Sequence, residues 1–195
     1  AVTSHVRIAP RPEDLNAVRI DTGAADLVLG ADLVVAASPD VISTIENGRT
    51  RAIVNSHETA TADFTLNRDF DLQADRLKAE IVLAAGESNA EFIDATAIGT
   101  RFFGDSITAN IFLLGLAFQR GCIPVSLESL TRAIELNGVS VETSKRVFAL
   151  GRAAAENPDL LRVAEDKIEP VGVETPQDVV DRRVIFLTEY QNAAY

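Results

Sequence analysis

Between residues 25 and 55 the chain has one stretch that limits its fold more than any other. The run 25–37 is rich in Val, Leu and Ala, and a strand with apolar residues on both faces belongs in a sheet covered by helices on both sides. Ser38-Pro39 then gives an N-cap and a proline at the first helical position of a helix that Gly48 ends. Arg51 to Asn55 is the next buried strand. This order, with short connections, predicts a βαβ unit and a parallel sheet.

The chain as a whole divides into an α/β half, about residues 1–103, followed by a helical half. We therefore predict a Rossmann-like α/β fold, with a mostly parallel sheet covered by helices and a helical C-terminal half. Residues 1–168 form the expected domain, and residues 169–195 a linker and the start of a C-terminal helical segment. Further strands are expected at 5–9, 17–20 and 92–95. Helices are expected at 38–47, 110–120, 127–137 and 177–195, from Asp71 or Asp75 to 85, and from Ser140 or Val141 to 156.

Composition and charge exclude several classes of protein. With 195 residues, 47% of them hydrophobic, the chain can bury a core without disulfides or a structural metal. A net charge of −11 disfavours nucleic acid as a partner. No run reaches the ~18 apolar residues of a membrane span. The single cysteine, Cys122, is typical of a reducing compartment, so we expect a cytoplasmic protein, and its position at a helix exit disfavours a nucleophile.

The candidate ligand-binding residues are Ser4, His5, Arg7, His57 and Asn110. His57 follows a predicted strand, at the end where open α/β sheets bind ligands, although polar residues are also common in such loops. On the first predicted strand, Ser4 and His5 offer hydrogen-bonding groups and Arg7 a fixed cation, although a partly buried histidine that is satisfied within the protein is also typical of such a strand. Asn110 is an amide at the start of a very apolar helix, where it must find hydrogen-bond partners.

Catalytic and metal-binding patterns are sparse. No Gly-x-Gly-x-x-Gly occurs, and the two histidines form no i, i+4 pair that could hold a metal. One cysteine cannot hold an iron–sulfur cluster. The carboxylates near the long polar segment are interpreted as a solvated face; they are Asp63, Asp69, Asp71 and Asp75. We expect no catalytic residue, metal or cofactor within this chain.

Four segments together resemble a known family. Val2 to Ile8, Ala24 to Asp32 and Asn110 to Ala117 resemble the gamma-type domain of the 2-oxoacid:ferredoxin oxidoreductases. Arg182 to Tyr195 is similar to the segment that follows this domain in fused indolepyruvate ferredoxin oxidoreductases. In that family a Gly-rich turn and a first strand–helix unit precede the Val-Arg-Ile strand, so the resemblance implies a chain that starts inside the domain.

The resemblance implies a function for the parent enzyme. Such enzymes decarboxylate an aryl 2-oxoacid with thiamine diphosphate, pass electrons through [4Fe–4S] clusters to ferredoxin, and release an acyl-coenzyme A. Thiamine diphosphate and the clusters belong to other domains, beside which this one packs. The expected role of the chain is an accessory, assembly-forming domain that is inactive alone.

Two other interpretations stay open on the sequence alone. The chain could be a self-sufficient Rossmann-like module that holds a small ligand at its strand ends, or a purely structural scaffold. Beyond the parent enzyme's domains, ferredoxin and coenzyme A, a homo-oligomer is a further expected partner, because exposed apolar surface favours self-association.

Overall fold

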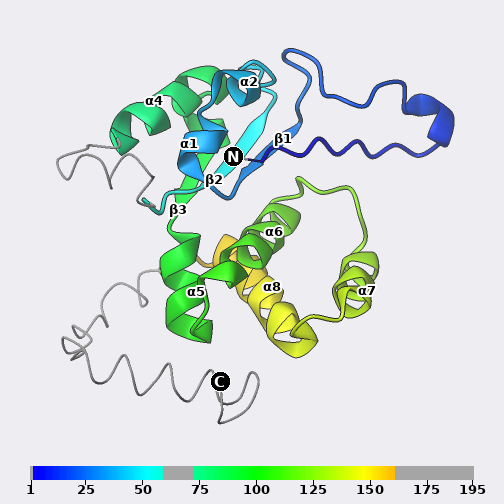
Figure 1. Ribbon diagram of the computed structural model, residues 1–195, viewed down its shortest axis with the longest axis vertical. Helices are drawn as coiled ribbons and strands as arrows, with labels where there is room; N and C mark the ends of the chain where they lie inside the picture. Colours follow the sequence, from blue (N-terminus) through cyan, green and yellow to red (C-terminus); the bar gives the residue numbers. More distant parts are fainter. Residues whose placement is uncertain (1, 59–72, 161–195) are drawn as a thin grey trace, which may run out of the picture. The chain divides into compact units, whose positions relative to one another are not determined.

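The computed structural model describes residues 2–58 and 73–160 of the chain. The chain divides into two units, Ala1–Leu161 and Arg162–Tyr195, and the second falls wholly outside the described residues. The helix predicted at 177–195 and the boundary predicted after residue 168 also lie there. All the described helices and strands belong to the first unit (Figure 1).

Three parallel strands form the sheet of the described unit. They are β1 (Leu27–Gly30), β2 (Arg51–Asn55) and β3 (Ala90–Ile93), in the order β1-β2-β3. Leu27 pairs with Arg51, and Asn55 pairs with Ile93. The middle strand has the bounds that the sequence predicts, and the parallel sheet is confirmed.

Helices cover both faces of this sheet, because β2 is apolar on both sides. Ile53 packs into a cluster with the helices of the C-terminal half, while Ala52 and Val54 pack into a second cluster with α1 (Leu33–Ala36) and α4 (Ala74–Ala85). Ala52, Ile53 and Val54, the three middle residues of β2, are 0% exposed. The predicted Rossmann-like α/β arrangement is thus the observed one.

The Val-rich tail of the first apolar run is a helix, where the sequence predicts a strand. β1 ends at Gly30, and the Asp32 side chain accepts a hydrogen bond from Val35 N at 2.9 Å, which caps α1. The turn needs glycine at position 30, because a Cβ there would lie only 2.8 Å from Ala36 Cβ. The cap and the close approach outweigh the strand propensity of the β-branched residues.

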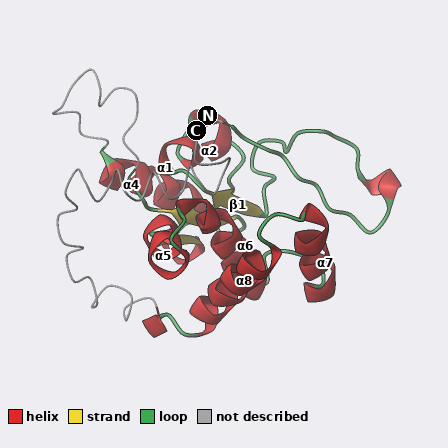
Figure 2. Cartoon of the chain, turned by 60° about the horizontal axis from the view of Figure 1, so that its bottom comes forward, coloured by secondary structure: helices red, strands yellow, loops and turns green. Residues whose placement is uncertain are grey.

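The two strands predicted before β1 are absent from the described sheet. Residues 2–21 form an extended arm without strand pairing, with one 3-10 turn, η1 (Pro12–Asp14), at its tip. Figure 1 shows this arm in dark blue as a long loop beside β1, and Figure 2 shows the same loop from a second direction. An alternating pattern yields a strand only where a neighbouring strand completes the hydrogen bonds.

Helix α2 and strand β3 also differ from their predicted bounds. α2 (Pro39–Ile42) stops five residues before the predicted end, because the Ser43 and Thr44 hydroxyls donate to carbonyls one turn earlier, Asp40 O and Val41 O. β3 ends at Ile93, since Asp94 accepts from Ala97 N at 2.7 Å and starts a helix. That helix, α5 (Ala95–Phe103), leads through η3 (Ser106–Thr108) to the helical half.

The helical half follows the sequence closely. It contains α6 (Ala109–Gln119), α7 (Leu127–Asn137) and α8 (Val141–Glu156). Ser126 caps α7 through Ser129 N at 3.1 Å, and Gly138 ends it in the left-handed region at φ 73°. The apolar helix α6 is buried as predicted, with Phe112 and Leu116 at 0% exposure.

Two glycines let α6 and α8 touch backbone to backbone. A Cβ on Gly115 would lie 2.2 Å from Phe148 O, and a Cβ on Gly151 would lie 2.1 Å from Phe112 O. These distances are far below any real Cβ contact, so only glycine fits at either position. The pair forms the centre of the core that covers one face of the sheet (Figure 1).

Candidate functional site

A buried amide joins the carboxyl ends of the three strands. Asn55, 5% exposed, donates to Ala31 O at 3.1 Å and to Thr96 Oγ1 at 2.8 Å. Its Oδ1 accepts from Ala95 N at 3.0 Å and from His57 N at 3.3 Å. Both donors and the carbonyl oxygen are used, so the desolvation of this amide is compensated by the protein itself.

This amide positions His57 beside a carboxylate. His57 Nδ1 lies 3.2 Å from the Asp94 carboxylate, which also caps α5. Their side chains are 38% and 45% exposed, respectively. A carboxylate at Nδ1 fixes the imidazole plane and places the proton on Nδ1, so Nε2 remains as an acceptor. The predicted position of His57 at the carboxyl end of a strand is the observed one; whether it binds a ligand stays a prediction.

Ser4 and His5 lie at a different place, along the outer edge of β1. A hollow of about 1040 Å³ runs there, lined by the arm on one side and by β1, α1 and α2 on the other. His5 Nδ1 accepts a hydrogen bond from Ile20 N at 3.1 Å, which ties the two limbs of the arm together. Both Ser4 and His5 are exposed.

Arg7 is occupied within the arm. Its guanidinium donates to Arg19 O, through Nε at 3.1 Å and also through Nη2, and its Nη2 lies 3.3 Å from Asp21 Oδ2. The predicted role as a cation for a phosphate or carboxylate ligand is therefore in competition with a structural role. The structure favours Arg7 as the residue that closes the arm.

Asn110 stands apart from both places. It lies in the first turn of α6, and its side chain is exposed. Water can satisfy an exposed amide, so its place in an apolar helix does not by itself require a ligand; whether Asn110 binds one stays a prediction. The structure brings Ser4 and His5 together at the hollow; neither His57 nor Asn110 is among the residues that line it.

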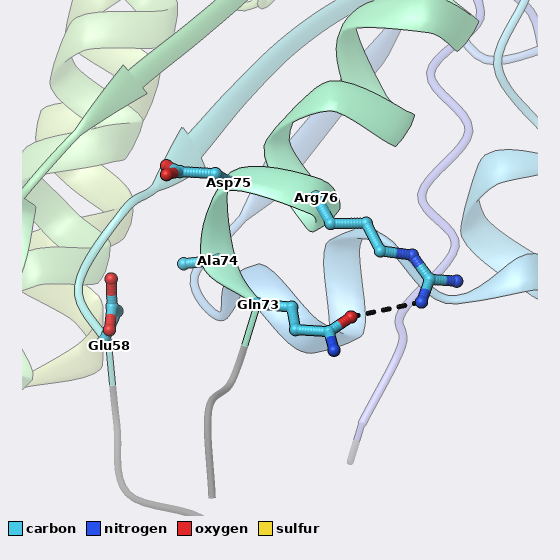
Figure 3. A pocket seen from close by; sticks show the side chains of 5 residues that line it. All are labelled: Glu58, Gln73, Ala74, Asp75 and Arg76. Atoms are coloured by element: carbon cyan, nitrogen blue, oxygen red, sulfur yellow. Dashed lines mark hydrogen bonds between the residues drawn. The ribbon is translucent and has the colours of Figure 1, made fainter.

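A smaller hollow of about 400 Å³ lies at the start of α4, where five residues line it (Figure 3). The carboxylates of Glu58 and Asp75 lie on one side, and Arg76 turns away to donate to Gln73 Oε1 at 3.2 Å. The side chain of Asp75 is fully exposed, as its assignment to a solvated face predicts. Asp63, Asp69 and Asp71 lie outside the described residues.

Cys122 is half-buried next to the end of α6. Burial raises the pKa of its thiol, since desolvation disfavours the thiolate more than the nearby Arg51 guanidinium favours it. A raised pKa lowers the fraction of the reactive thiolate at neutral pH. This agrees with the prediction that Cys122 is not a nucleophile.

The sequence reasoning missed three residues of the carboxyl-end cluster: Asn55, Asp94 and Thr96. A signal was available, because Asn55 ends a buried strand and Asp94 directly follows one, and parallel strands bring such ends to one edge of the sheet. Among the described residues no group of three or more His, Cys, Asp or Glu could hold a metal ion. No helix in the described ranges is long and apolar enough to cross a membrane.

The parallel sheet and the helices on its two faces define the class of this protein. It is an open α/β domain of Rossmann-like topology. Residues 1–154 match the pyruvate ferredoxin/flavodoxin oxidoreductase family, and the chain belongs to it. It is thus a domain of a 2-oxoacid:ferredoxin oxidoreductase, and domains of this family work in multi-domain or multi-subunit enzymes with ferredoxin. No curated protein and no solved structure matches the chain.

Proposed function

We propose that this chain is an accessory, assembly-forming domain of an indolepyruvate ferredoxin oxidoreductase. The parent enzyme oxidatively decarboxylates an aryl 2-oxoacid to an acyl-coenzyme A in the cytoplasm and passes the electrons to ferredoxin. The match of residues 1–154 to the family carries the proposal. The aryl substrate rests on the similarity of Arg182 to Tyr195 to the fused indolepyruvate enzymes.

The strand ends support an accessory role over a complete active site. In open α/β sheets the carboxyl ends of the strands are where ligands bind. Here Asn55 uses its donors and its carbonyl oxygen on Ala31, Thr96, Ala95 and His57. Chain groups thus occupy every hydrogen-bonding group of this amide, which leaves it none to offer to a cofactor. The same fact gives less support to a self-sufficient small-ligand module.

The donor set does not fit an iron–sulfur cluster. A [4Fe–4S] cluster takes four cysteine thiolates, and the chain contains one cysteine. We therefore place the clusters in other domains of the parent enzyme, and the family resemblance implies the same for thiamine diphosphate. No step of the reaction is assigned to residues of this chain.

The test combines the full chain with the thiamine diphosphate and iron–sulfur parts of the enzyme and follows ferredoxin reduction on indolepyruvate, phenylpyruvate and pyruvate. We expect turnover to depend on the chain and to be fastest with the two aryl substrates. Faster turnover of pyruvate would contradict the aryl assignment. Equal turnover with and without the chain would contradict the accessory role.

Coenzyme A and Arg7 provide a second experiment in the same assembly. Arg7→Ala releases Arg19 and Asp21 and loosens the arm, so we expect lower turnover or weaker use of coenzyme A. Arg11→Ala is the matched control, because Arg11 pairs only locally with Asp14 and Glu13 at the tip. Unchanged kinetics in the Arg7 variant, or equal losses in both variants, would show that Arg7 has no specific role in turnover or in the use of coenzyme A.

A further inference from the structure

We draw no further inference here: the strongest candidate, the His57–Asp94 side-chain pair at the carboxyl ends of β2 and β3, lines neither of the two hollows described above, so nothing in the described part of the chain shows what ligand its Nε2 would meet.

Discussion

The α6–α8 pair and the arm are held in place by opposite means. The two helices touch through Gly115 and Gly151 and bury Phe112 and Leu116 completely. In the arm, hydrogen bonds and ion pairs hold the backbone while Val6 and Val18 remain exposed. Buried apolar contacts set the stability of a domain, while exposed polar ties set local shape at little gain in free energy. The two regions should therefore respond very differently to mutation.

The largest effect is expected at the helix contact. Gly151→Ala places a Cβ against Phe112 O and should lower the free energy of unfolding by about 3 kcal/mol, although helix propensity alone would raise it by about 1 kcal/mol. Urea unfolding followed by circular dichroism measures the change. The control is Ala149→Gly at an exposed position of α8, which should cost about 1 kcal/mol. A stabilised Gly151→Ala variant would show that the helices do not touch here.

The buried amide should come next. Asn55→Ala leaves the Ala95 amide and the Ala31 carbonyl without a partner and should cost about 2 kcal/mol. The same unfolding experiment applies, with hydrogen exchange of the Ala95 amide as a local readout. Asn157→Ala removes an exposed asparagine at the end of α8 whose Oδ1 accepts, among the described residues, only from the exposed Asp159 N–H, so it should cost less, about 0.5 to 1 kcal/mol. Equal losses of stability in both variants would show that Asn55 does not hold the strand ends together.

A smaller effect on stability is expected in the arm. Arg7→Ala should lower the free energy of unfolding by less than about 1 kcal/mol, because the pair with Asp21 is solvent-exposed on the carboxylate side. Proteolysis at the arm should nevertheless become faster than in the wild type, since its shape depends on this guanidinium. A loss of several kcal/mol would show that the arm belongs to the core after all.

The smallest effect is expected at the tie between α7 and α8, and it depends on pH. Lys145 Nζ lies 2.9 Å from Glu135, and its hydrogen bond lowers the pKa of that carboxyl group. A folded-state pKa below the unfolded one stabilises the fold above the unfolded value, and this gain disappears as the pH falls through the folded value. Glu135→Gln should thus be slightly destabilising at neutral pH and neutral in strong acid. In a double-mutant cycle, Lys145→Gln should add little further, because its remaining partner, Glu142, lies 3.8 Å away.

Elements with matching signals at both ends were predictable from the sequence. α7 has a capping serine, a helical period and a terminal glycine, and its observed bounds are the predicted ones. The failures, Leu33–Ala36 and the arm, share the same cause: aliphatic residues favour a strand, but what they become depends on contacts distant in sequence. Asp32 and Gly30 turn the first segment into a helix against β2, and the arm has no described strand beside it.

The candidate site was only partly predictable for a related reason. Sequence order shows that His57 follows a strand, but the parallel register is what brings Asp94 to His57 and Thr96 to Asn55. Asn55 was not singled out, because an asparagine at a strand end is common and its partners Ala31 and Thr96 lie 24 and 41 residues away. Equally, the alternation of Ser4, His5 and Arg7 gave no sign that Arg7 would bind the backbone of its own arm.

The two imidazoles carry their protons on opposite ring nitrogens. His5 accepts the Ile20 N–H at Nδ1, so neutral His5 is the Nε2–H tautomer, while neutral His57, with Asp94 at Nδ1, is the Nδ1–H tautomer. The chain contains only these two histidines. Their ring nitrogens should therefore give two separate patterns in long-range ¹H–¹⁵N spectra. One pattern then reports closure of the arm, and the other reports the strand ends, within a single sample and without any label attached to the protein surface.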